Sequence, residues 1–128
     1  MSTILILEDE AVLLEAISEV ISLLGYDVIT CRRGSVALEK LRESKGRVVA
    51  LWVDLWLDDW MNGCDFLRMV ADEGLFCGKV VVATGMENVE KDFSECFDVL
   101  RWKFADVTVC TKPVTVEEIR EALRDVAA

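Results

Sequence analysis

Short apolar runs recur five times along the chain, separated by longer segments with a different periodicity. Within each run, consecutive positions are apolar rather than alternating, as in ILIL and VVALWV. Strands of this kind are buried on both faces and are typical of a parallel sheet covered by helices. The predicted strands are Ile4–Leu7, Val28–Thr30, Val48–Val53, Lys79–Ala83 and Val107–Cys110.

The segments between these runs carry apolar residues at the three- and four-residue spacing of an amphipathic helix. Gly25, Gly46 and Gly74 mark helix ends, and Asn62-Gly63 predicts a turn before the third helix. Strand and helix alternate five times, which predicts one α/β domain over residues 1–128 with a doubly wound parallel sheet. The predicted helices contain Val12–Leu24, Val36–Leu41, Phe66–Val70, Val89–Leu100 and Val116–Val126.

Polar residues with distinctive chemistry follow four of the five predicted strands. Parallel strands bring their carboxyl ends to one edge of the sheet, where ligands of doubly wound folds bind. We therefore expect these residues to form one site, whereas the second strand ends near Cys31, which offers no obvious chemistry. The candidate residues are Glu8, Asp9, Asp54, Thr84 and Lys112.

Three carboxylates at one edge repel each other unless a cation joins them. Oxygen ligands without histidine or cysteine suit Mg²⁺, which prefers one or two carboxylates together with phosphate oxygens. Lys112 adds a positive charge, Thr84 a hydroxyl group and Gly85 an approachable backbone N–H. Such a set suits phosphoryl transfer in which the Asp54 carboxylate attacks in line and becomes an aspartyl phosphate.

Each of these residues alone also has an ordinary structural explanation. Glu8 and Asp9 could stabilise the beginning of the first helix, because acids suit that end of the helix dipole. Thr84 could simply end a strand, and Lys112 could be a solvated loop charge. Their joint placement at successive strand ends favours the site.

Composition excludes several classes of function. The net charge of −10 disfavours direct binding to nucleic acid or to an anionic membrane surface. No apolar run approaches the roughly 20 residues that cross a bilayer. The beginning MSTILILEDE lacks the pattern of a signal peptide, so we expect a cytoplasmic protein. The chain has no histidine, which excludes a Ser-His or Cys-His catalytic pair and a phosphohistidine of its own.

The five cysteines are scattered and form no CxxC pair. Without histidine they also lack the usual zinc-binding patterns. We therefore expect them to be small apolar fillers in a reducing compartment. They are Cys31, Cys64, Cys77, Cys96 and Cys110.

Four motifs in combination resemble the receiver domain of two-component response regulators, and the resemblance covers the whole chain. They are ILILEDE, VDLWL followed by MNG, VVVATG, and TKPV. The resemblance implies a CheY-like, flavodoxin-like fold with strand order 2-1-3-4-5 and Mg²⁺ as cofactor. It also implies a histidine kinase or phosphotransfer protein as partner, and an output protein that binds the face of the fourth helix, fifth strand and fifth helix.

The resemblance assigns roles to individual residues. Asp54 would be the phosphoacceptor and a metal ligand, beside Asp9 and Glu8. The backbone carbonyl of Trp56 would complete the protein ligands to the metal. Thr84 and Lys112 would be the switch hydroxyl and the phosphate-binding lysine. A cis peptide bond is implied before the only proline, Pro113.

The sequence departs from the family pattern in several places. The spacing from Asp54 to Gly63 is one residue longer than the common one. Val109 occupies the position that usually holds the aromatic partner of the switch hydroxyl. The segment from Thr84 to Lys112 is longer than usual, so we expect phosphorylation to remodel residues 86–106. Trp56 and Met86 occupy positions that tune dephosphorylation in the family, and as large apolar groups they predict slow hydrolysis.

Three alternatives remain at this point. A degenerate receiver would act as a phosphorylation-independent interaction module, which Val109 favours and the complete acid, Thr84 and Lys112 set opposes. A haloacid-dehalogenase-like phosphatase would need an acid where Trp56 stands, and a dinucleotide binder would need a glycine-rich loop after the first strand. We expect a non-enzymatic phosphoacceptor that is either a stand-alone protein or excised from a larger one. A homodimer is compatible with this expectation, and the sequence does not identify the output partner.

Overall fold

The computed structural model describes residues 2–44, 46–57, 60–85 and 93–127. Met86 and Val89, which carried expectations from the sequence, lie outside these residues. The strands are β1 (Thr3–Leu7), β2 (Asp27–Cys31), β3 (Val48–Val53), β4 (Lys79–Thr84) and β5 (Asp106–Thr111). The helices are α1 (Ala11–Leu23), α2 (Gly34–Ser44), α3 (Gly63–Asp72), α5 (Ser94–Lys103) and α6 (Val116–Ala122). No helix in the described ranges is long and apolar enough to cross a membrane.

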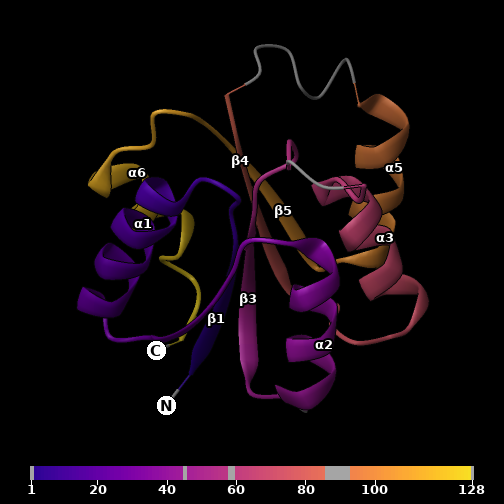
Figure 1. Cartoon of the computed structure of the whole chain (residues 1–128), viewed down its shortest axis with the longest axis horizontal. Helices are drawn as coiled ribbons and strands as arrows, with labels where there is room; N and C mark the ends of the chain where they lie inside the picture. The colour runs from indigo at the N-terminus through magenta and orange to yellow at the C-terminus, as the bar shows by residue number, and fades with distance from the viewer. Residues whose placement is uncertain (1, 45, 58–59, 86–92, 128) are drawn as a thin grey trace.

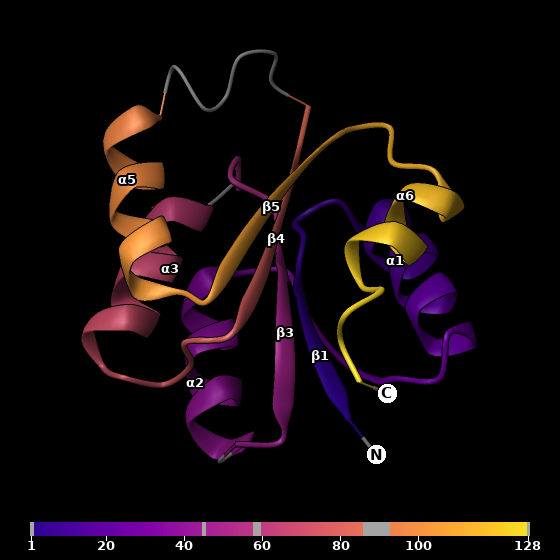
Figure 2. The same cartoon turned by 180° about the vertical axis from the view of Figure 1, so that it is seen from behind.

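The five strands form one parallel sheet in the order β2-β1-β3-β4-β5, which confirms the predicted fold class and strand order. Helices α1 and α6 cover one face of the sheet, and α2, α3 and α5 cover the other (Figure 1, Figure 2). The result is a three-layer α/β/α domain. Because all strands run the same way, their carboxyl ends meet at one edge of the sheet.

The uninterrupted apolar runs are explained by burial on both faces. In β1, Ile4 and Ile6 face the core under α1 and α6, whereas Leu5 and Leu7 face the core under α2, α3 and α5. The same alternation continues in β3 and β4. Four of the five residues of β1 are therefore apolar side chains with no exposed surface, and the strand holds its charged carboxyl end firmly in place.

One local expectation needs correction. Asn62-Gly63 is not a free turn: Asn62 caps α3, and its side chain and that of Asp65 bond each other's backbone N–H groups. This capping box satisfies N–H groups that the beginning of a helix otherwise leaves without partners. In α1 the buried residues are Leu14, Ile17 and Ile21.

The expectation that every cysteine is an apolar filler is wrong for three of the five. Cys31 and Cys110 are buried and free, as fillers are, but Cys77 is exposed. Cys64 on α3 and Cys96 on α5 form a disulfide bond, with Cα atoms 6.4 Å apart. The two residues are 32 positions apart in the chain. They meet because α3 and α5 pack side by side on the same face of the sheet.

Candidate functional site

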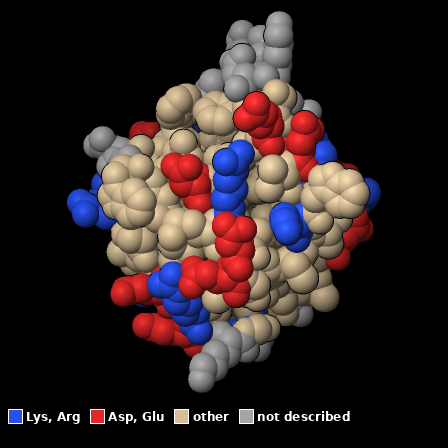
Figure 3. Space-filling view, turned by 90° about the vertical axis from the view of Figure 1, so that its right-hand side faces the viewer, with Lys and Arg blue, Asp and Glu red and all other residues tan. Residues whose placement is uncertain are grey.

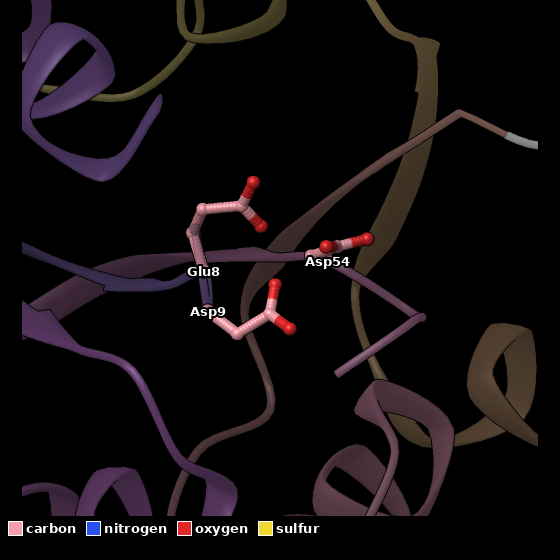
Figure 4. Close-up of side chains that lie close together, drawn as sticks. All are labelled: Glu8, Asp9 and Asp54. Atoms are coloured by element: carbon pink, nitrogen blue, oxygen red, sulfur yellow. The ribbon is translucent and has the colours of Figure 1, made fainter. Parts of the chain in front are cut away.

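Three carboxylates meet at the carboxyl edge of the sheet. Glu8 and Asp9 directly follow β1, and Asp54 directly follows β3. The Asp54 backbone N–H donates to the Leu7 carbonyl over 2.9 Å, which fixes the end of β3 beside the end of β1. One carboxylate oxygen from each acid lies within 4.8 Å of the others, and Figure 4 shows Glu8 and Asp9 on the same side of Asp54.

Lys112 brings a positive charge from the end of β5 into this acidic cluster. Its backbone N–H donates to the Thr84 carbonyl over 2.8 Å, so the ends of β4 and β5 stay together. Its Nζ lies 2.6 Å from Glu8 Oε1 and 3.1 Å from Asp54 Oδ2. The peptide bond between Lys112 and Pro113 is cis, the isomer that the resemblance implied.

The electrostatics of the cluster follow from burial and charge. Glu8 and Asp54 are only 1% and 5% exposed. Burial, together with the neighbouring Asp54, raises the pKa of Glu8 to about 8, although Lys112 acts in the opposite direction. Burial also lowers the pKa of Lys112, but its hydrogen bond with Glu8 and the charge of Asp54 outweigh burial and raise the pKa. Lys112 therefore stays charged, and the repulsion between the carboxylates is expressed in the raised pKa of Glu8.

The donor set fits a hard divalent cation. Glu8 Oε2 is buried and has no hydrogen-bond partner among the described residues. Burial of a carboxylate oxygen without a hydrogen-bond partner costs free energy of folding, and a bound cation would offset this cost. Three carboxylates within reach of one point, without nitrogen or sulfur ligands, suit Mg²⁺ better than a softer metal. Three acids and one lysine also leave negative charge for such an ion to neutralise.

The structure places the remaining predicted site residues around this cluster. Thr84 is fully buried at the end of β4. Gly85 is exposed, and a side chain added there would meet no other atom within 4 Å, so its backbone faces open space. Gly63 has the opposite surroundings: an added Cβ would lie 2.2 Å from the Asp54 carbonyl oxygen. Only glycine lets the beginning of α3 approach the loop after Asp54 this closely.

Trp56 connects the loop after Asp54 with the segment that precedes α5. Its backbone N–H donates to Asp54 Oδ1 over 3.2 Å. Its indole ring is 53% exposed and packs edge-on against Phe93, with ring centroids 5.5 Å apart. The loop beside Asp54 is therefore in direct contact with the residue before α5.

Val109, where the family usually has an aromatic residue, is half-buried in β5. It packs against the core beneath α2, α3 and α5 and pairs with Val82 of β4. The valine thus serves as a core residue on the side of the sheet that α5 covers.

Arg32 belongs to the site region although its sequence position gave no reason to single it out. It follows β2, and its Nε and Nη2 atoms donate to the Asp9 carbonyl oxygen over 3.0 and 2.9 Å. The two hydrogen bonds fix the backbone of Asp9, whose carboxylate belongs to the cluster. Its one signal in the sequence is its place at a strand end, directly after Cys31.

Comparison with known proteins agrees with this geometry. The family model for the response regulator receiver domain matches residues 4–124. A comparison with curated proteins gives no match. Solved structures match at low identity. Vibrio cholerae chemotaxis protein CheY4 has a TM-score of 0.82 at 21% identity, with 99% of each chain covered. Response regulator TrrA of Thermotoga maritima, in complex with Mg²⁺ and BeF, has a TM-score of 0.79 at 20% identity, with 99% of this chain and 100% of that chain covered.

A receiver domain protein from Clostridium thermocellum has a TM-score of 0.78 at 20% identity, with 98% of this chain and 93% of that chain covered. At such identities these likenesses show the shared fold. The family match spans nearly the whole chain and rests on sequence. The chain therefore belongs to the response regulator receiver domain family.

Proposed function

We propose that this receiver domain is a phosphoacceptor of a two-component phosphorelay and that Asp54 receives the phosphoryl group. Family membership supports the phosphoacceptor role in two-component signalling. The observation that carries the assignment to Asp54 is its buried carboxylate at a strand end, held by Lys112 on one oxygen and by the Trp56 N–H on the other. A buried carboxylate beside two further acids has no evident structural use.

The donor is a histidine kinase or a phosphotransfer protein. Asp54 attacks the phosphorus atom of a phosphohistidine, the P–N bond breaks, and the imidazole leaves with the bonding electron pair. Lys112 moves its hydrogen bond from the Asp54 carboxylate to a phosphoryl oxygen. The Thr84 hydroxyl and the Gly85 N–H donate to the remaining oxygens, which stabilises the charge that develops there.

Mg²⁺ would be held by Glu8, Asp9, Asp54 and the Trp56 carbonyl, and when bound it supplies positive charge to the phosphoryl oxygens. The unpartnered Glu8 Oε2 and the clustering of the three carboxylates support this set. The similar TrrA protein is in complex with Mg²⁺ and BeF, which agrees with the proposal.

Output follows from a change in partner binding at the face of α5, β5 and α6. The contact between Trp56 and Phe93 supports a connection from the acceptor loop to α5 that does not need an aromatic residue at position 109. The protein acts in the cytoplasm and catalyses only its own phosphorylation and dephosphorylation. A homodimer that forms through the same face is compatible with this output.

The test is incubation with acetyl phosphate and Mg²⁺, followed by intact mass spectrometry. We expect one phosphoryl adduct on the wild type and none on Asp54→Asn. Asp72→Asn is a matched control, because Asp72 is an exposed acid at the far end of the adjacent helix and should leave the adduct unchanged. An unmodified wild type would contradict the proposal and favour the phosphorylation-independent interaction module instead.

A further inference from the structure

The Cys64–Cys96 disulfide lies where the acceptor loop meets α5. Cys64 follows Gly63, the residue that packs against the Asp54 carbonyl. Cys96 comes three residues after Phe93, which touches Trp56. The disulfide therefore connects the region of Asp54 covalently with the first turn of α5.

Both sulfur atoms occupy positions that favour thiol–disulfide chemistry. Cys64 lies in the first turn of α3, and Cys96 lies in the first turn of α5. The beginning of a helix stabilises a thiolate, which makes the sulfur a better leaving group. At α5 no side chain caps these N–H groups, because the residue before the helix is Phe93.

Cys64 and Cys96 are only 6% and 4% exposed, so a reductant would reach the bond through the surface cavity that both residues line. Its volume is about 360 Å³, and both cysteines line it together with Arg68 and the acids Asp65 and Glu95. Figure 3 shows the side of the molecule that carries α2, α3 and α5, where acidic and basic side chains are interspersed. Since charges of both signs surround the cavity, neither an acidic nor a basic thiol is excluded from it.

We propose that Cys64 and Cys96 form a reversible redox site that small thiols reduce and disulfides re-form, and that its oxidised state holds α5 against α3. This step rests on the cytoplasmic location proposed above, because disulfides of cytosolic proteins are usually transient and catalytic or redox-sensing rather than structural. Closure of a 32-residue segment by one covalent bond restricts the relative motion of the two helices.

The reaction balances as an exchange with two thiols. A reductant thiolate attacks one cysteine sulfur, the S–S bond breaks, and the other cysteine leaves as a thiolate and takes a proton from solvent. A second thiol attacks the mixed disulfide and releases the first cysteine. Two protein thiols and one reductant disulfide result, so the protein gains two electrons and two protons. Oxidation by a small disulfide is the reverse.

The first measurement counts thiols. Native protein is equilibrated in glutathione buffers of increasing oxidised fraction, quenched in acid, denatured and alkylated for intact mass. We expect five alkylated thiols in reduced glutathione and three in the oxidised buffer, the three being Cys31, Cys77 and Cys110. The triple variant that replaces these three by serine should change from two thiols to none. A count that stays at five, or at three, across all buffers overturns the proposal.

The second measurement is amide exchange of α5 without any ligand. In the disulfide form we expect α5 peptides to exchange at least about tenfold more slowly than in the dithiol form, with no change in α1. In Cys64→Ser, the exchange rate of α5 should be the same in oxidising and reducing buffer. In Cys77→Ser, it should differ between the two buffers as in the wild type. Equal exchange of α5 in both redox states would refute the link between the bond and the helix.

A third measurement connects this site to signalling and rests on the proposed function. With Mg²⁺ and beryllofluoride, we expect the exchange of α5 to respond in the dithiol form and to stay unchanged in the disulfide form. The same response in both forms overturns that connection. No response in either form counts against Asp54 as acceptor, while the first two measurements, which need no phosphoryl group, still decide the redox site.

Discussion

Lys112 Nζ lies 3.1 Å from Asp54 Oδ2 and so joins the end of β5 to the end of β3 across the carboxyl edge of the sheet. The side chain of Lys112 is 18% exposed and the side chain of Asp54 is 7% exposed. Little water reaches the pair, so the interaction is stronger than a surface salt bridge. The same ammonium group also contacts Glu8, which places one positive charge between two buried acids.

Replacing Lys112 by alanine should slow phosphorylation of Asp54 on the order of a hundredfold, because removal of one preorganised charge donor has that effect on charged transition states. The rate of adduct formation with acetyl phosphate, followed by intact mass, measures it. Lys103→Ala removes the same charge from an exposed position at the end of α5 and should leave the rate unchanged. Equal rates for the two variants would show that Lys112 has no part in the transfer.

Replacing Asp9 by asparagine should abolish the stabilisation of the fold by Mg²⁺. A ligand that binds only the folded state raises the melting temperature, and loss of a carboxylate ligand removes this effect. Without Mg²⁺ the variant should melt no lower than the wild type, because one repelling charge is gone from the cluster. Thermal melts with and without Mg²⁺ measure both effects, and Asp98→Asn on α5 is the control. A variant that Mg²⁺ still stabilises fully would exclude Asp9 as a ligand.

Arg32→Ala should weaken Mg²⁺ binding by about tenfold, because its two hydrogen bonds fix the Asp9 backbone. Electrostatics alone predicts tighter Mg²⁺ binding, since the variant removes a positive charge near the carboxylate cluster. The neighbouring Arg33→Ala removes the same charge without those bonds and should leave binding unchanged or slightly stronger. Calorimetric titration with Mg²⁺ distinguishes the two, and tighter binding in both variants would reject the positioning role.

Trp56→Ala should shorten the lifetime of the acyl phosphate about threefold or more, because we expect the indole of this residue, whose backbone N–H bonds Asp54, to restrict access of water. The loss of the adduct after removal of acetyl phosphate gives the rate. Trp102→Ala removes an indole that is 89% exposed on α5 and should leave the decay unchanged. If Trp56→Ala decays at the wild-type rate, the ring covers the loop without shielding the phosphate.

The Lys79–Asp106 pair should make a small, pH-dependent contribution to stability. The hydrogen bond from Lys79 holds the pKa of Asp106 below its ordinary value, while burial acts in the opposite direction. Because the folded pKa is the lower one, the contribution is present above about pH 4 and is lost as the pH falls through the folded value.

Asp106→Asn should therefore lower the free energy of unfolding at pH 7 by about 0.2–1 kcal/mol, since the Asp106 side chain is 58% exposed and screened by solvent. The difference from the wild type should shrink as the pH falls below about 4. Urea denaturation at several pH values measures it, with Asp72→Asn as control. A difference that grows in acid would contradict the assigned sign.

Sequence periodicity predicted the fold because it records burial directly. The apolar runs of β1, β3 and β4 have no polar face, and only a sheet covered on both sides accommodates them. Parallel strands then require Asp9, Asp54 and Lys112 to meet at one edge, whatever the details of the loops. This is why the residues of the candidate site could be named without coordinates.

Contacts between residues far apart in sequence did not follow from periodicity. No spacing rule connects Cys64 with Cys96, because they belong to two helices that meet only in the folded chain. Arg32 follows an uninformative strand end, and its role appears only when its guanidinium reaches the Asp9 carbonyl. The capping function of Asn62 also depends on a backbone geometry that a turn signal does not distinguish.

The sequence by itself thus determined the alternation of strands and helices along the chain and the chemistry collected at the carboxyl edge, since both depend on local burial and on the geometry of parallel strands. Only the tertiary structure decided which helices face each other, which oxygens Lys112 contacts and which cysteines are bonded. Those features depend on distances of a few ångströms between segments whose packing is set by the whole core.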